Sequence, residues 1–238
     1  MTEPTKNRVL LSLDAETRAA VLDACERTER SAGTILERAG DATSAGYFPE
    51  TAVISTLASY SDGATVDMAN VGREGCAAIN LTLGHSTHLS TDEIQIAGTV
   101  LMLPAERFRR LQAEHRAFER ALFSSVQALI YQVMVSGACN ASHDARQRLA
   151  RWLLTLRDRS DGREMRLTHE FLAHMLGVRR ATVTEAASGF RKAGLIDYAH
   201  GRVTIEDRAG LRSASCECYD LVRRTTDALL PDRSAASS

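Results

Sequence analysis

The sequence predicts an α+β fold built in three consecutive parts. Residues 34–103 divide into short β-type segments separated by turn residues, which is typical of antiparallel structure. Residues 106–136 contain no Gly or Pro and predict one long helix. After them, two short amphipathic segments meet at a glycine and lead into a hairpin. We therefore expect an N-terminal antiparallel β-roll, a long helix, and a C-terminal helical domain with a small hairpin.

The N-terminal third begins with a predicted helix over residues 10–29, on which Leu13, Val21, Leu22 and Cys25 form a loosely apolar face. Asp62-Gly63 predicts a tight hairpin, because a type I′ turn needs positive φ at both central positions. The segments that we expect as strands are Thr34–Arg38, Gly46–Phe48, Ala52–Tyr60, Thr65–Val71, Glu93–Ala97 and Thr99–Leu103.

The predicted long helix carries an apolar stripe at alternating spacings of four and three. Such a repeat suits a coiled-coil seam between two copies of the chain, while the opposite side of the helix packs on the β-roll. The residues that we expect in the seam are Leu122, Val126, Leu129 and Val133, with Phe123 and Ile130 widening it.

Residues 167–194 predict two helices joined by a tight turn. Thr168 can cap the first helix, and Gly177 can take the left-handed conformation that ends it. A hinge over residues 137–142 and a helix over residues 144–157 precede this pair. Gly194 ends the second helix, and Ile196–Ala199 and Arg202–Ile205 predict a hairpin around His200-Gly201. The order of elements is that of a helix-turn-helix followed by a wing.

The second helix of the pair has one apolar and one polar face, and its first residues are basic. Arg179 and Arg180 oppose the helix dipole, so they are placed poorly for helix stability and well for reaching phosphates or guanine edges. That placement favours DNA binding over an ordinary pair of core helices. The apolar face has Val183, Ala186, Ala187 and Phe190, and the polar face has Arg179, Arg180, Thr182, Thr184, Glu185 and Ser188.

The distribution of charge agrees with this assignment, although the chain as a whole has a net charge of only −1. From Ala141 onwards it has 17 Lys and Arg against 13 Asp and Glu, whereas the preceding part has 12 against 17. The basic half is therefore the half with the helix-turn-helix. A single tryptophan and 5% aromatic residues leave little for stacking on single-stranded bases, so duplex DNA is the expected ligand.

A β-roll, a long helix and a winged helix-turn-helix in this order resemble the Crp/Fnr family of bacterial transcription regulators, from about residue 10 to 230. The resemblance implies a homodimeric regulator that binds a palindromic site, with double-stranded DNA, a second copy and RNA polymerase as partners. It implies a cyclic-nucleotide-binding-like sensor domain over residues 1–112, a dimerisation helix and hinge over 113–138, a DNA-binding domain over 139–206, and a C-terminal helix with a disordered tail over 207–238. Asp207 is expected to cap that last helix.

The resemblance also assigns DNA contacts. The family's recognition helix begins Ser-Arg-Glu-Thr-Val, and Arg180 and Thr182 match it, whereas Ala181 and Glu185 depart from the family's carboxylate and second arginine. We therefore do not expect this chain to recognise the family's best-known half-site. We expect Arg180 to read bases, Thr168, Arg179 and Thr182 to hold phosphates, and Thr184, Glu185, Ser188 and the wing residue Arg202 to complete the interface.

The sensor half lacks the residue that would hold a cyclic phosphate. Family members that bind cyclic nucleotides use a Gly-Glu pair for the ribose and, further along the chain, an arginine for the phosphate. Here Gly72-Arg73-Glu74-Gly75 is followed by no Lys or Arg through Glu106, so we do not expect cyclic AMP to bind. The sequence His85-Ser86-Thr87-His88 could hold a metal with Asp92 or Glu93, but we interpret it as a polar loop.

The five cysteines, an odd number and scattered, suggest a reduced cytoplasmic protein. An iron–sulfur cluster of the kind found in this family would need a close N-terminal run of cysteines, and Cys25 stands alone there. Cys216 and Cys218 would face different ways on one helix, so we interpret them as packing residues. We expect no cofactor and no metal.

Two other classes of function stay open beside the regulator. A cupin-like metal-dependent enzyme would need several histidines and a glutamate inside the β-roll, and a protein-interaction adaptor would have kept the shape without the DNA contacts. We expect no catalytic residues. We also expect no membrane partner, because no uninterrupted apolar run approaches the roughly 20 residues that span a bilayer.

Overall fold

The computed structural model describes residues 5–61, 65–161 and 164–231. The chain divides into two compact units: unit 1 contains Met1–Tyr131 and Arg224–Ser238, and unit 2 contains Gln132–Arg223. The first unit is thus longer than the predicted sensor domain and includes the end of the chain. The predicted disordered tail falls almost wholly on residues outside the described ranges, as does the predicted Asp62-Gly63 turn.

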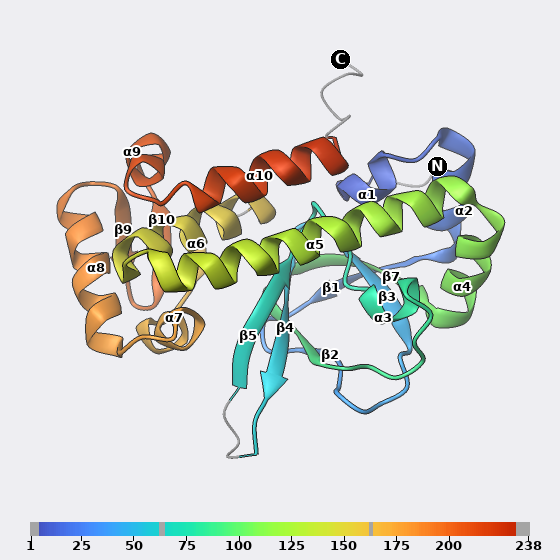
Figure 1. Ribbon diagram of the computed structural model, residues 1–238, viewed down its shortest axis with the longest axis horizontal. Coiled ribbons are helices and arrows are strands. Elements are labelled where there is room, and N and C mark those ends of the chain that lie inside the picture. Colours follow the sequence, from blue (N-terminus) through green and yellow to red (C-terminus); the bar gives the residue numbers. More distant parts are fainter. Residues whose placement is uncertain (1–4, 62–64, 162–163, 232–238) are drawn as a thin grey trace. The chain divides into compact units, whose positions relative to one another are not determined.

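Unit 1 is built around two antiparallel sheets (Figure 1). All six strands predicted from the sequence are present, and β4 and β5 on either side of the predicted turn pair directly. The first sheet has the order β1 (Glu26–Arg30), β7 (Gly98–Pro104) and β3 (Ala45–Pro49). The second has the order β2 (Ile35–Glu37), β6 (Thr91–Ile96), β4 (Val53–Ser59) and β5 (Thr65–Val71).

The prediction of one helix over residues 10–29 is wrong. The chain instead forms α1 (Arg8–Leu11), α2 (Ala15–Ala24) and the strand β1. Asp14 starts α2 by accepting a hydrogen bond from the Thr17 backbone N–H, which separates it from α1. Strand β1 is polar throughout and, among the strands that the structure describes, pairs with β7 alone, so no local apolar alternation could reveal it.

Three phenylalanines form the centre of the core of unit 1. Phe48 of β3, Phe108 of α4 (Ala105–Glu114) and Phe118 of α5 (Arg116–Ser142) are fully buried. Their ring centroids lie 5.6–6.5 Å apart, within the range of favourable aromatic pairs. The short helix α3 (Ile79–Thr82) contributes Leu81 to the same core. This core joins the helices of unit 1 to its first sheet.

Asn7 connects the N-terminal segment to the β-roll. Its buried amide donates hydrogen bonds to the Pro49 and Gly75 carbonyls, both at 2.9 Å. Its side-chain oxygen accepts from the Val9 N–H at 3.1 Å and caps α1. One side chain therefore satisfies backbone groups from three separate segments.

The predicted long helix is two helices, because α4 ends before His115 and α5 begins at Arg116. Helix α5 then runs through Gly137 to Ser142, so the hinge predicted over residues 137–142 is absent. By length and composition α5 is apolar enough to cross a membrane, contrary to the sequence-based expectation, but this is weak support for a span. The helix carries no charged side chain from Ala121 to Ser142.

The predicted seam residues do not share one exposed face of α5. Leu122 and Val126 are buried, and Leu122 belongs to the core of unit 1. Leu129 is half-buried, and only Val133 is exposed. The reason is that apolar residues line both the side of α5 that packs into the core of unit 1 and the outer side. A 3.5-residue repeat in the sequence does not distinguish these two sides.

Unit 2 contains the predicted pair of helices and hairpin, shown from yellow to red in Figure 1. Helix α6 starts at a capping box formed by Asp144 and Gln147. A three-stranded antiparallel sheet has the order β8-β10-β9, of which β8 was not predicted. The elements are α6 (Ala145–Arg159), β8 (Glu164–Arg166), α7 (His169–Leu176), α8 (Arg180–Lys192), β9 (Ile196–Ala199), β10 (Arg202–Ile205) and α9 (Arg208–Ser213).

The predicted C-terminal helix is also two helices. Asp207 caps α9 as expected, by accepting from the Gly210 N–H at 2.9 Å. The helix ends at Ser213, and α10 (Cys218–Leu229) begins after a turn. The apolar spacing along residues 211–229 continues across the break, so the helical period alone could not reveal the turn.

We predict that Asn7→Ala lowers the free energy of unfolding by about 2–4 kcal/mol, because two buried carbonyls lose their donor and α1 loses its cap. Urea denaturation measures the change. Asn140→Ala, at an exposed position of α5, is the control and should stay within about 0.5 kcal/mol of the parent protein. Equal losses in the two variants would contradict the role given to Asn7.

Candidate DNA interface

The turn between α7 and α8 is held by local backbone chemistry. The Thr168 hydroxyl accepts a hydrogen bond from the Phe171 N–H at 3.1 Å and caps α7, as predicted. Gly177 ends that helix with φ 59° and ψ 40°, in the left-handed region that a residue without Cβ enters at low cost. Helix α8 starts three residues later, so the angle between the two helices is set by this turn.

The buried face of α8 is the one that the sequence predicts. Val183, Ala186, Ala187 and Phe190 are all buried in unit 2. The guanidinium of Arg146 from α6 lies over the Phe190 ring, 5.2 Å from its centroid. Packing on this side leaves a polar face exposed, and it contains Arg179, Arg180, Thr184, Glu185 and Ser188.

Arg179 and Arg180 mark the start of α8. Arg179 is the capping residue but its side chain makes no capping hydrogen bond, and Arg180 is the first helical residue. Both are exposed, and among the described residues neither forms an ion pair. Two positive side chains at the positive end of a helix dipole do not stabilise the helix. They are therefore available to bind an anionic ligand.

A small polar group fixes the beginning of α8 against the wing. The Thr184 hydroxyl lies 3.0 Å from Nδ1 of His169 and donates to the Arg180 carbonyl at 3.0 Å. The His169 ring stacks on Tyr198 of β9 with centroids 4.4 Å apart, and the Tyr198 hydroxyl donates to the Leu167 carbonyl. Thr184 thus has a structural role beside any contact with DNA.

Burial and the positive charge of Arg180 lower the pKa of His169 below its ordinary value. The imidazole is therefore neutral near pH 7, and it adds no positive charge to the exposed face of α8. The basic character of this face comes from the two arginines.

The wing has the geometry predicted for it. Strands β9 and β10 pair antiparallel, and the turn residues His200 and Gly201 have φ values of 52° and 72°. Positive φ at both positions is the signature of a type I′ turn. Arg202 is exposed and forms an ion pair with Glu164 of β8 at 3.1 Å. The wing arginine is therefore held by a partner on the neighbouring strand.

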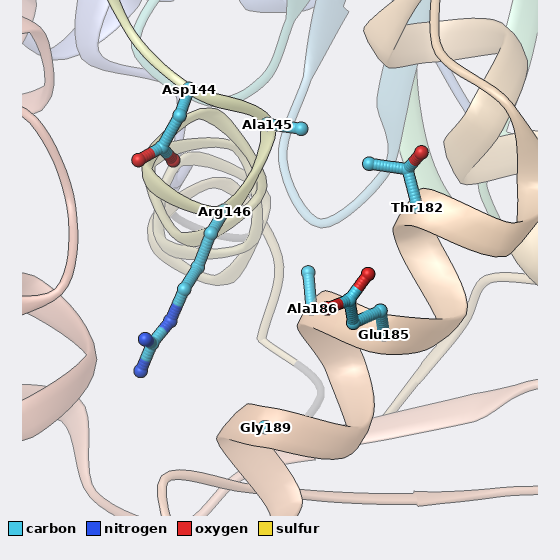
Figure 2. Close-up of a pocket in the computed structure, with 7 residues that line it drawn as sticks. All are labelled: Asp144, Ala145, Arg146, Thr182, Glu185, Ala186 and Gly189. Atoms are coloured by element: carbon cyan, nitrogen blue, oxygen red, sulfur yellow. The ribbon is translucent and has the colours of Figure 1, made fainter.

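Unlike the other predicted contacts on α8, Thr182 is not fully exposed. It is half-buried and lines a cleft of about 390 Å³ between the start of α6 and one side of α8 (Figure 2). Arg146 lines the same cleft from α6 and is exposed. The sequence interpretation did not select Arg146, although its place just after the Asp144 cap put it at the exposed start of a helix. The residues lining the cleft are Asp144, Ala145, Arg146, Thr182, Glu185, Ala186 and Gly189.

These features define a winged helix-turn-helix domain with a basic-tipped second helix, in a chain that also contains an antiparallel β-roll. Comparison with known families agrees, since residues 147–214 match the family described as the Crp-like helix-turn-helix domain. A comparison with curated protein sequences found no match.

Solved structures match over most of the chain. A Crp-family transcriptional regulator from Thermus thermophilus is 19% identical with a TM-score of 0.64, covering 80% of this chain and 99% of its own. FixK2 from Bradyrhizobium japonicum is 14% identical with a TM-score of 0.65, covering 81% and 98%. A putative Crp/Fnr regulator from Eubacterium rectale is 17% identical with a TM-score of 0.62, covering 87% and 96%.

Residues 147–214 therefore form a Crp-like helix-turn-helix domain, and the chain has the fold of the Crp/Fnr transcription regulators. The resemblance predicted from the sequence is confirmed.

Proposed function

We propose that the protein regulates transcription by binding a palindromic DNA site as a homodimer. The observation that carries this proposal is the exposed start of α8 within a Crp-like helix-turn-helix domain, where two arginines form no ion pair with any residue that the structure describes. A two-fold dimer would place its two α8 helices in successive major grooves, about 34 Å apart. RNA polymerase is the partner through which such a regulator would act.

The exposed residues divide between base reading and phosphate contact. Arg180 points from the first turn of α8, where a guanidinium can donate two hydrogen bonds to one guanine. Arg179 precedes the helix, and together with Thr168 at the start of α7 it is placed for phosphate contact. Glu185 and Ser188 lie further along the exposed face, and Thr182 and Arg146 would meet the backbone from the cleft beside α8.

A revised seam on α5 supports the dimer. Phe123, Ile130, Val133 and Met134 are exposed at 45%, 49%, 42% and 66%. Phe123, Gln127, Ile130, Met134 and Gly137 follow one another at spacings of four and three, the pattern of a coiled-coil seam, and all five are exposed. Large apolar side chains in such a row are typical of a protein-protein interface. This row replaces the seam through Leu122 and Val126.

We also propose that the sensor domain does not take cyclic AMP. Glu37 and Asp92 are cross-strand neighbours on β2 and β6, and both are buried. His88 lies beside them, with Nε2 3.4 Å from an Asp92 oxygen. Burial opposes charging of His88, but the hydrogen bond to Asp92 and its negative charge outweigh burial and raise the pKa of His88. Buried carboxylates within the β-roll would repel a cyclic phosphate that came close to them.

The same group of residues argues against the cupin-like alternative. His88 is engaged by Asp92 and by the Ser90 carbonyl, which lies 2.7 Å from its Nδ1. His85 is exposed. His88 has carboxylate neighbours, but in the described part of the chain neither histidine belongs to a set of three ligand atoms close enough to share one ion. The regulator therefore accounts for more of the chain than an enzyme does.

We predict that Arg180→Ala relaxes the preference for one base pair in each half-site and costs about 1–3 kcal/mol on the specific site. Arg179→Ala should weaken binding to all sequences alike and reduce the salt dependence of binding, since each phosphate contact releases counterions. The measurement is competition binding on a palindrome first selected from random fragments by the purified protein.

Equal loss of specific and random DNA in the two variants would disprove this division of roles and would move recognition to the wing around Arg202 or to DNA shape. If the purified protein shows no salt-dependent binding to duplex DNA, the adaptor function would apply instead. An adaptor makes no phosphate contacts, so its binding would release no counterions.

We predict that Ile130→Glu converts the dimer to monomers, because the seam would have to bury an unpaired carboxylate. Light scattering after size-exclusion chromatography measures the mass. Leu89→Glu places the same charge at a leucine that is 72% exposed and lies outside α5, and this control should remain dimeric. A dimer that survives Ile130→Glu would refute the seam.

We predict that millimolar cyclic AMP changes neither the melting temperature nor the affinity for DNA. A ligand present at 100 times its dissociation constant should stabilise the folded protein by about 2.7 kcal/mol, which a thermal melt detects. A clear upward shift of the melting temperature would show that the chain binds cyclic AMP without the missing arginine.

A further inference from the structure

Four side chains with metal-binding atoms converge in unit 2, and none of them belongs to α8. Cys139 lies in the last turn of α5 and His143 directly follows the last residue of that helix. The His143 N–H donates to the Cys139 carbonyl at 3.0 Å, so the helical path continues far enough to put both side chains on the same side. Cys216 and Cys218 stand at the turn that separates α9 from α10. One sulfur or nitrogen atom from each of the four lies within 4.8 Å of every other.

The turn explains why the sequence interpretation missed this group. Cys216 precedes α10 and Cys218 is its first residue, so the two are not on one regular helix. Their sulfurs can therefore face the same point, which residues two apart on a helix cannot do. The signal in the sequence is a Cys-x-x-x-His pair and a Cys-x-Cys pair, separated by more than 70 residues.

The distances match those of a single tetrahedral ion. Zinc–sulfur bonds of about 2.3 Å at tetrahedral angles place neighbouring ligand atoms about 3.8 Å apart. The Cys139 and Cys216 sulfurs are 3.5 Å apart, and the Cys218 sulfur lies 3.7 Å from Nδ1 of His143. The four atoms thus need only small adjustments to surround one ion.

His143 is already oriented as a metal ligand. Its Nδ1 faces the sulfurs, while its Nε2 lies 3.3 Å from a Glu217 carboxylate oxygen. A ligating imidazole normally donates its other N–H to a carboxylate, which fixes the ring and raises its basicity. Glu217 lies between the two cysteines in sequence, so one turn supplies two sulfurs and the residue that would orient the histidine.

The surroundings suit a negatively charged centre. Cys139, Cys216 and Cys218 are buried, and Arg148 and Arg151 of α6 are close enough to act on these sulfurs electrostatically. The turn is anchored beside the cluster, because the Tyr219 hydroxyl donates to Asp158 and Arg208 pairs with the same carboxylate at 2.8 Å. The framework of the site is therefore built by the protein itself.

We propose that Cys139, His143, Cys216 and Cys218 bind one zinc ion as a structural site. On binding, each of the three thiols gives its proton to water and becomes a thiolate, and the neutral imidazole completes four-coordination. Three thiolates and one zinc ion leave one net negative charge, with which the positive charges of Arg148 and Arg151 would interact favourably. Thiolate and imidazole ligands in a closed tetrahedral set select zinc over the harder magnesium and calcium ions.

Two other fates of the cysteines are less well matched to the geometry. An iron–sulfur cluster contains several irons and would set its cysteine sulfurs farther apart than one ion does. A disulfide between Cys139 and Cys216 would draw the two sulfurs to about 2.0 Å and leave Cys218 and His143 without a role. A single ion uses all four groups.

The zinc would connect the end of α5 to the turn between α9 and α10, and so to the helix-turn-helix. Arg148, beside the cluster, donates a hydrogen bond to the Leu176 carbonyl at the end of α7. Leu176 directly precedes the Gly177 turn. Metal occupancy would therefore stabilise the part of unit 2 that holds α7 and α8 in place.

The experiment measures metal in the untagged full-length protein, purified with reductant and without chelator. Elemental analysis by mass spectrometry should find about one zinc per chain. Cys216→Ser and His143→Gln should lose it, whereas Cys25→Ser, which removes a cysteine of unit 1, should retain it. Cobalt bound in place of zinc should give the intense visible absorption of a tetrahedral thiolate site.

A further variant tests the site even if the proteins with substituted ligands fail to fold. Glu217→Gln keeps all four ligands and should release zinc to a chelator about 10-fold to 100-fold more readily than the parent protein. The proposal is overturned by zinc that remains in every variant, or by a parent protein that takes up none even with added zinc and reductant. Stoichiometric iron and sulfide, or a Cys139–Cys216 disulfide in peptide maps, would overturn it as well. These measurements need no DNA, so their outcome is independent of the proposed function.

Discussion

The packing of the apolar face of α8 is the constraint on which the helix-turn-helix half of the chain depends. Phe190 and Val183 are buried to 0% and 1% exposure, so α8 can neither rotate nor slide without opening a cavity in the core. With that face fixed, Arg180 projects from the exposed side of the helix. Its placement at an unfavourable end of the helix dipole is tolerated because burial of the opposite face supplies far more free energy than the charge costs.

Local hydrogen bonds and caps then determine the angle between α7 and α8 more closely than packing alone does. Gly177 sets the exit from α7, Thr168 sets its entry, and the His169–Thr184 contact links the first turn of α8 to the start of α7. Each of these contributes on the order of 1 kcal/mol, which is small beside the core but enough to select one angle between the helices. Recognition of DNA at the level of single base edges needs that angle to be unique.

Features with a local cause could be predicted from the sequence. The Thr168 cap, the Gly177 turn, the buried face of α8 and the His200-Gly201 hairpin each depend on residues within a few positions of one another. Six of the seven strands of the β-roll were also found from short apolar segments. For the candidate site, the exposed positions Arg179, Arg180, Glu185 and Ser188 follow directly once the apolar face of the helix is known.

Features with a long-range cause could not be predicted. Strand β1 exists because β7 pairs with it across about 70 residues, and its own polar sequence carries no signal. Leu122 is buried because Phe118 and its neighbours meet the β-roll on that side of α5, and the heptad pattern cannot tell an outer partner from an inner one. The four metal-binding side chains meet only because a turn interrupts the apolar spacing between α9 and α10.

The uncharged length of α5 has a consequence for the life of the protein in a cell. In the dimer proposed above, a chain would expose Phe123, Ile130 and Met134 until it met a second copy, which would couple its folding to its own concentration. Newly made copies at low abundance would present an apolar helix to chaperones and proteases, whereas copies made in quantity would cover it at once. Such a regulator would be degraded when its concentration is low and would persist when its concentration is high. Its steady-state concentration would therefore rise more than proportionally with its rate of synthesis.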